Sequence, residues 1–166
     1  MPARTSRRRA AVALLSAAAL AAMLSGCSKT RDGAVGIGPE GNETVVVQLV
    51  TCTYPATEIQ LLVDDGSEQV AEAPVAQDAG VSSTYRLVEL FGTDVVEELD
   101  PGVDYRLRGR VTDEEGTRLT DTATFSLDEV STYPDGEVSG NDVDGPTTQE
   151  AFAMQACAEE DRTGKS

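Results

Sequence analysis

The chain has 166 residues and a formal net charge of −16, and it contains neither histidine nor tryptophan. So acidic a chain repels nucleic acid and anionic lipid head groups, which argues against both as general partners. Without histidine, the chain lacks the commonest general base and the commonest metal ligand.

The N-terminal residues predict an export signal. Residues 1–9 hold four arginines and no acid, and residues 10–24 are almost entirely Ala, Leu and Val. A helix that spans a bilayer needs about 20 apolar residues, so this shorter segment indicates a signal peptide and not an anchor of the mature protein.

The apolar segment ends in Leu24-Ser25-Gly26-Cys27, which resembles the lipobox of bacterial lipoproteins. The resemblance implies that the thiol of Cys27 is acylated, that the chain is cut before it, and that Cys27 becomes a lipidated N-terminus. An ordinary secretory signal, in which Cys27 has no special role, is the alternative. The lipoprotein interpretation predicts an extracytoplasmic protein held on the cell membrane by lipid.

The mature chain would have 140 residues, enough for one domain, and its nine basic and 29 acidic residues would give a net charge of −20. Solubility in the medium outside the cell explains this acidity, and binding of divalent cations is the alternative. With Cys27 assigned to lipid, Cys52 and Cys157 remain as a pair in an oxidising compartment. We therefore predict a disulfide that joins residues 105 positions apart.

Several elements follow in chain order. The β-branched run over residues 44–52 predicts a strand, with Val47 and Leu49 facing the core and Val46 and Val50 on the other face. The later predictions are a strand over residues 57–63, a loop over 66–82 with at most a ragged edge strand, and a strand over 83–91.

A turn follows in which Leu99, Pro101, Gly102 and Tyr105 have a distinctive spacing. It resembles the turn into the sixth strand of fibronectin type III domains. The resemblance implies a tyrosine corner, in which the Tyr105 hydroxyl bonds to backbone upstream and its ring caps the core. Pro101 and Gly102 favour a tight turn there, and Leu99 would anchor one sheet.

Residues after this turn alternate in polarity. Tyr105, Leu107, Gly109 and Val111 are expected to face inward, and an arginine stripe to face outward, made up of Arg106, Arg108 and Arg110. We consider two roles for the stripe: cross-strand pairing, with Glu58 as a partner, or docking of an acidic protein or anionic glycan. A hairpin turn at 113–116 and a last strand through Leu119, Ala123, Phe125 and Leu127 complete the predicted sheets.

The C-terminal part predicts a helix. Thr147 and Glu150 have the spacing of a capping box, and Ala153, Met154 and Cys157 share one helix face. We expect the helix to lie across the outer side of the 44–52 strand, where the disulfide would pin it over Val46 and Val50.

These elements together predict an all-β protein, an immunoglobulin-like β-sandwich with a short C-terminal helix. The predicted parts are a signal peptide over residues 1–26, a flexible tether over 27–42, the sandwich over 43–127, an acidic linker over 128–146 and the helix over 147–160.

The chemistry in this sequence is sparse. The chain has no histidine, and both of its lysines lie in the tails, so the side chains that most often act as catalytic bases are missing from the folded part. We therefore expect no enzymatic activity and no cofactor. The acids in 140–145 are spaced as in part of an EF-hand loop, but the register of that loop fails at two positions. A weaker calcium site among Asp135, Asp142 and Asp144 is the alternative to a solvated linker.

We expect a lipid-anchored, non-enzymatic envelope protein whose sandwich binds another envelope protein, with the membrane contacted through the N-terminal lipid. The alternative is an extracytoplasmic lipoprotein that binds a solute or a cation such as calcium, and a third reading is a structural coat protein. Capture of a stoichiometric protein would favour the first, and ligand-dependent thermal stabilisation the second.

Overall fold

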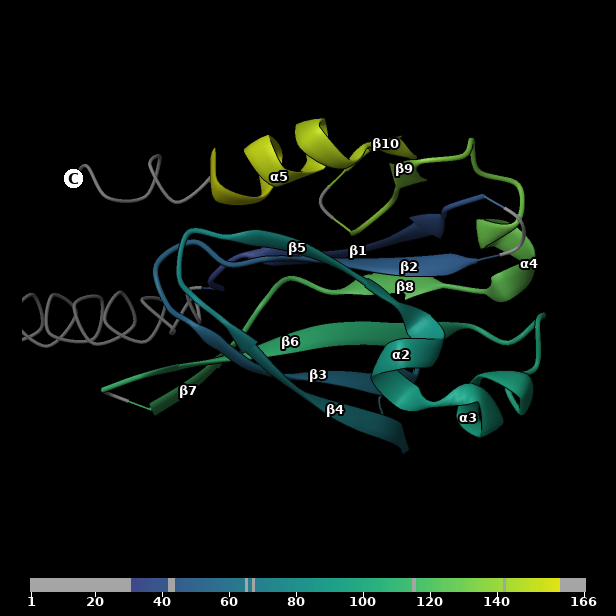
Figure 1. The fold of residues 1–166 in the computed structure, drawn as a ribbon, viewed down its shortest axis with the longest axis horizontal. Helices are drawn as coiled ribbons and strands as arrows, with labels where there is room; N and C mark the ends of the chain where they lie inside the picture. Colours follow the sequence, from purple (N-terminus) through teal and green to yellow (C-terminus); the bar gives the residue numbers. More distant parts are fainter. Residues whose placement is uncertain are drawn as a thin grey trace, which may run out of the picture.

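A computed structural model describes residues 31–41, 44–64, 66, 68–114, 116–141 and 143–158. Over these residues the protein is mostly β, and its two main antiparallel sheets lie in layers (Figure 1). The first sheet has the order β1-β2-β5, made up of Ala34–Pro39, Val45–Val50 and Ser82–Arg86. The second has the order β4-β3-β6-β7, with β8 also paired to β6; its strands are Ala56–Val63 (β3), Gln69–Gln77 (β4), Tyr105–Asp113 (β6), Gly116–Leu119 (β7) and Ala123–Phe125 (β8).

Strand β1 corrects the prediction of a flexible tether over residues 27–42. Its glycines permit close approach of other backbone and side chains. A Cβ on Gly38 would lie 1.8 Å from the carbonyl oxygen of Glu137, and one on Gly36 would lie 3.0 Å from the Phe152 ring. Residues 27–30 lie outside the described part of the chain.

Strand β4 replaces the predicted loop, with at most a ragged edge strand, over residues 66–82 by a nine-residue strand. It pairs antiparallel with β3, and the order of the sheet places it at an edge. An edge strand tolerates proline and needs no strict alternation, which is why Pro74 and the many alanines hid it from the sequence pattern.

The strand predicted over residues 83–91 is only half correct. Strand β5 ends at Arg86, and the helix α2 (Leu87–Phe91) follows, then α3 (Thr93–Glu97). Leu87 and Phe91 are both buried, and their separation of four residues is the spacing of one helix face. Gly92 then ends α2 with a φ of 88°.

The core between the sheets confirms the predicted inward faces. Val47 and Leu49 of β2 are fully buried, as are Ile59 and Leu61 of β3. Along β6, Tyr105, Leu107 and Val111 are buried, whereas the arginines between them are only partly covered. The Tyr105 hydroxyl accepts a hydrogen bond of 3.0 Å from the backbone N–H of Asp100, the arrangement expected of a tyrosine corner.

The predicted last strand and acidic linker contain more structure than expected. The last strand is interrupted between β7 and β8, and Leu127 begins the helix α4 (Leu127–Val130). The Ser126 hydroxyl caps α4 by accepting from the Glu129 N–H at 3.2 Å. Strands β9 (Glu137–Val138) and β10 (Thr147–Thr148) then form a two-stranded sheet, so α4 and β9 bring regular structure into the predicted linker, and β10 takes the place of the predicted first helical residues.

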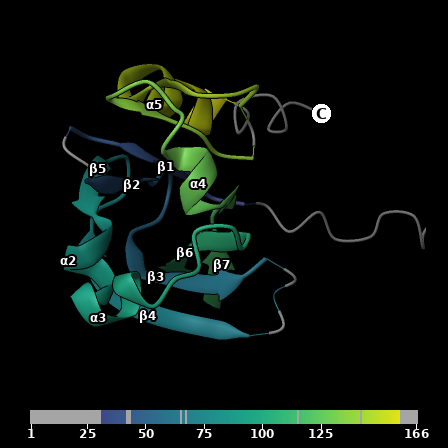
Figure 2. The same cartoon turned by 90° about the vertical axis from the view of Figure 1, so that its right-hand side faces the viewer.

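Helix α5 (Gln149–Ala158) lies on the outer side of the first sheet, opposite the second sheet (Figure 2). Its Phe152 forms a second buried cluster with Ala34, Val50 and Val138. The predicted position of the helix is therefore correct, but two details were wrong. Met154 is 66% exposed, and Thr148, not Thr147, accepts a hydrogen bond from the first turn, from the Ala151 N–H at 3.3 Å.

Candidate functional site

Cys52 and Cys157 form a disulfide in the structure. Cys52 lies two residues after the end of β2, and Cys157 lies in the last turn of α5. The turn that carries Cys52 is held by the buried carboxylate of Asp32, which accepts hydrogen bonds from the backbone N–H groups of Thr53 (2.8 Å) and Tyr54 (2.7 Å). The disulfide therefore joins α5 to a turn that has its own support.

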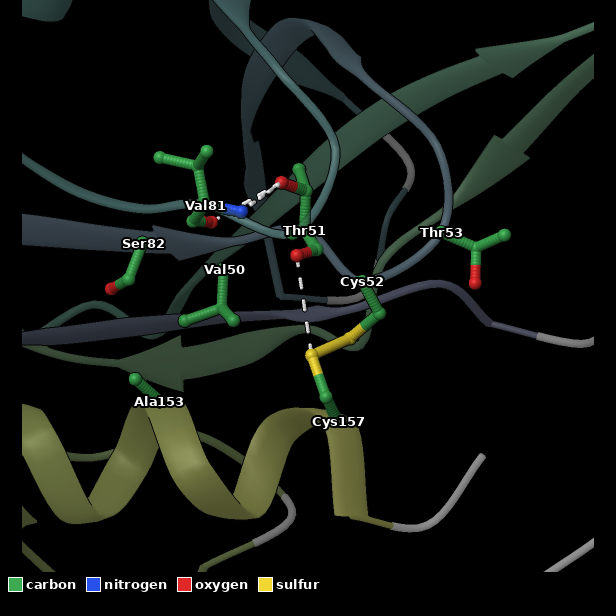
Figure 3. A pocket seen from close by; sticks show the side chains of 9 residues that line it. Val50, Thr51, Cys52, Thr53, Val81, Ser82, Ala153 and Cys157 are labelled. Carbon is green, nitrogen blue, oxygen red and sulfur yellow. Dashed lines mark hydrogen bonds between the residues drawn. A yellow bond between two sulfur atoms is a disulfide. The ribbon is translucent and has the colours of Figure 1, made fainter. Parts of the chain in front are cut away.

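A pocket of about 430 Å³ lies beside the disulfide (Figure 3). Its walls come from the turn after β2, the turn before β5 and helix α5, and they are made up of Val50, Thr51, Cys52, Thr53, Gly80, Val81, Ser82, Ala153 and Cys157. The Thr51 hydroxyl is already engaged, because it donates to the carbonyl oxygen of Asp78 at 2.7 Å. The walls thus combine apolar side chains and the disulfide with the hydroxyl-bearing Thr53 and Ser82.

The sequence predicted the pairing of the two cysteines that line this pocket, but it did not predict that residues 80–82 form the opposite wall. The segment 80–82 was expected to be loop, with no partner assigned. In the structure Gln77, which is 4% exposed, donates to the carbonyl oxygens of Leu49 (3.1 Å) and Val81 (2.8 Å) and fixes this segment beside β2. A lone glutamine at the end of an edge strand gives no sequence signal for such a role.

The arginine stripe on the outer face of β6 lies over β3. Arg110 pairs with Glu58 at 3.2 Å and Arg106 with Asp64 at 2.8 Å. Between them, Arg108 donates from Nε to the side-chain oxygen of Gln60 at 2.8 Å. The predicted cross-strand pairing with Glu58 is confirmed. The partner of Arg108 is an uncharged amide, and that amide in turn donates to the Glu58 carboxylate at 2.6 Å.

The predicted calcium ligands are not all described. Asp142 lies outside the described residues, Asp144 is exposed, and the Asp135 carboxylate accepts a hydrogen bond from the Gly41 N–H. Over the part of the chain that the structure describes, no group of three or more acidic or cysteine side chains could hold a metal ion. The calcium site stays a prediction.

Tyr133, which follows α4, has an altered acidity. Burial, together with the hydrogen bond to Glu129 and the charge of that carboxylate, raises the pKa of its phenol to about 12. The Tyr133 hydroxyl donates to the Glu129 carboxylate at 2.9 Å. At neutral pH the Tyr133 phenol therefore keeps its proton and donates it in a hydrogen bond to Glu129 of α4.

The lipobox at Leu24–Cys27 lies outside the described residues. Among those that are described, no helix is both long enough and apolar enough to cross a membrane. A scan against protein-family models, a search of curated proteins and a search of solved structures found no match to this chain.

Proposed function

We propose that this chain is an extracytoplasmic lipoprotein, anchored to the cell membrane by an acylated Cys27, whose immunoglobulin-like sandwich binds another envelope protein without catalysing a reaction. The observation that carries the proposal is the disulfide between Cys52 and Cys157. It suits an oxidising compartment, and it accounts for two of the three cysteines in the sequence. The third, Cys27, stands where a lipoprotein signal peptide would be cut.

The strand order supports the immunoglobulin-like assignment. Strands β1, β2 and β5 form one layer and β4, β3, β6 and β7 the other, so the chain passes between layers as in a Greek-key sandwich. The Tyr105–Asp100 hydrogen bond lies at the start of β6, the sixth strand in chain order, as the resemblance to fibronectin type III domains implies.

Recognition of a protein suits this architecture. Leu49, Ile59 and Leu107 fill the space between the two sheets. A partner would therefore contact the outer surface of the sandwich, which is how one folded protein binds another. The outer surface of β6 offers Arg108, whose charge faces the neutral Gln60. An acidic patch on a partner would complement it, and an arginine at an interface gives directional hydrogen bonds as well as charge.

The experiment is mild crosslinking of the full-length protein in its native membrane, followed by purification under denaturing conditions. We expect one abundant protein to be captured by the wild type and lost in Cys27→Ala, which is released from the membrane. Arg108→Ala should reduce capture, whereas Arg86→Ala, on the other sheet, should not. A wild type that captures no protein would contradict the proposal.

A second candidate function is the binding of a small solute. The observation in its favour is the pocket beside the disulfide, whose volume of about 430 Å³ falls within the range of ligand sites. A thermal-shift screen of apolar solutes and of calcium against the mature protein tests it. Stabilisation that rises with ligand concentration would support this candidate, and a flat response would exclude it for the solutes tested.

A further inference from the structure

The chain enters the fold at the end that carries the disulfide. Arg31 forms an ion pair with Asp121, and the N–H of Asp32 donates to the Leu119 carbonyl at 3.4 Å. The side chain of Asp32 is 1% exposed and holds the turn after β2. The described chain is therefore fixed to the sandwich from residue 31 onward, well before the end of the predicted tether at residue 42.

The strand registers identify what else lies at this end. Ala34, at the start of β1, pairs with Val50, and Ala56, at the start of β3, pairs with Gln77 and Val111. The turn over 51–55, the turn over 78–81 and the β6–β7 hairpin therefore share one end with the chain entry. Helices α2, α3 and α4 lie at the opposite end (Figure 1).

Covalent geometry limits how far this end lies from an anchor at Cys27. The four residue steps from position 27 to position 31 reach at most about 14 Å, whatever their conformation. The head-group layer of one leaflet is itself roughly 5–7 Å thick. Strand β6, with nine residues, is about 30 Å long, so the helical end lies roughly that far along the sandwich from the end where the chain enters.

We propose that the disulfide end of the sandwich, made up of the turns over 51–55 and 78–81 and the β6–β7 hairpin, rests on the lipid head groups. The inference depends on the proposed acylation of Cys27. Arg118 stacks over the Tyr54 ring at this end, with its guanidinium carbon 4.7 Å from the ring centre, whereas the exposed Asp78 and Glu114 add negative charge there, so the lipid link and not charge would hold this end at the membrane. Tyrosine and arginine are residue types that sit at the level of the head groups.

This orientation assigns roles to the two ends. The pocket beside the disulfide then lies at the membrane-facing end, between the turn after β2, the turn before β5 and helix α5. A soluble partner meets the sheet faces and the helical end, where Val88 is 41% and Val103 36% exposed.

The test uses two glutamates that are both exposed and lie at opposite ends, Glu114 in the β6–β7 hairpin and Glu97 on α3. Each is replaced singly by a genetically encoded fluorescent amino acid in the full-length, membrane-extracted protein. The protein is reconstituted into vesicles of phosphatidylcholine, whose head groups carry no net charge, and a fraction of these head groups carry a nitroxide quencher. We expect the label at 114 to lose most of its fluorescence and the label at 97 to keep it.

A matched control lengthens the link. A Gly/Ser insert of about 20 residues after Lys29 adds a mean span of about 25 Å and should abolish the difference between the labels without releasing the protein. Equal or reversed quenching in a protein that floats with the vesicles would overturn the orientation alone. A wild type that fails to float, like Cys27→Ala, would overturn the anchoring and the orientation with it.

Discussion

The ring of Phe152 on α5 lies against Gly36 of β1. A Cβ at position 36 would be 3.0 Å from the ring carbon Cζ, closer than nearly all real contacts of a Cβ. Gly140 lies under the same ring, with a Cβ there 2.9 Å from Cε2. Two glycines thus form the seat of the aromatic side chain through which the helix packs on the first sheet.

Adding a methyl group at this seat should destabilise the fold. We expect Gly36→Ala to lower the free energy of unfolding by about 1–3 kcal/mol, because the ring must move within a filled cluster. Gly102→Ala is the control, since its Cβ would meet atoms no closer than 3.8 Å and should have little effect. Chemical denaturation of both variants checks the prediction, and equal stabilities would contradict it.

Removal of the disulfide should loosen α5 more than the sandwich. In the chain-entropy model, a loop of this length contributes up to about 4.7 kcal/mol, so Cys52→Ala with Cys157→Ala should lower the denaturation midpoint clearly. Because Phe152 still packs, the helix should stay folded but exchange its amide hydrogens faster than β6 does. Hydrogen exchange measured by mass spectrometry distinguishes the two segments. Unchanged exchange in residues 149–158 would show that the disulfide does not hold the helix.

The pair of Glu58 and Arg110 should contribute modestly to stability. Both side chains are partly exposed, and such pairs contribute about 0.2–1 kcal/mol. Arg110→Glu should destabilise more than Arg110→Ala, because it places two carboxylates opposite each other. The exchange Glu58→Arg with Arg110→Glu should recover most of that loss. Thermal unfolding at low salt measures the cycle, and a failure to recover would mean that the pairing does not explain this end of the stripe.

Tyr133 should titrate late. Its pKa is raised from 10.0 to about 12 in the folded protein, so between these values the unfolded chain releases the proton while the folded chain keeps it. The stability that results is fully present below pH 10 and is lost as the pH rises through about 12. Ultraviolet titration of tyrosinate should show a late component that disappears in Tyr133→Phe and moves to lower pH in Glu129→Gln. A late component that persists in Tyr133→Phe would contradict the assignment.

The sequence was informative where side-chain pattern and structure coincide. Alternation along β6 identified the buried face, and the spacing of Leu99, Pro101 and Tyr105 identified the corner. The even cysteine pair identified the disulfide and, through it, the position of the helix. In each case the residue type has one dominant structural role, so its role could be predicted from its position in the sequence.

The errors occurred where a residue type has two uses. Glycine in β1 was taken as a source of flexibility, but Gly36 and Gly38 serve close packing against elements about a hundred residues later in the chain. Likewise, Leu87 and Phe91 fit a strand as well as one turn of helix. Local sequence does not distinguish such uses, because the deciding contacts are distant along the chain. The pocket wall over 80–82 was missed for the same reason.

The most direct test of the central claim is the mass of the N-terminal peptide of the protein extracted from its native membrane. The account predicts a peptide that begins at Cys27 and carries the mass of added acyl chains, with Cys52 and Cys157 recovered together in one disulfide-linked pair. A peptide that extends upstream of Cys27, or an unmodified Cys27 in protein recovered from the medium, would contradict it.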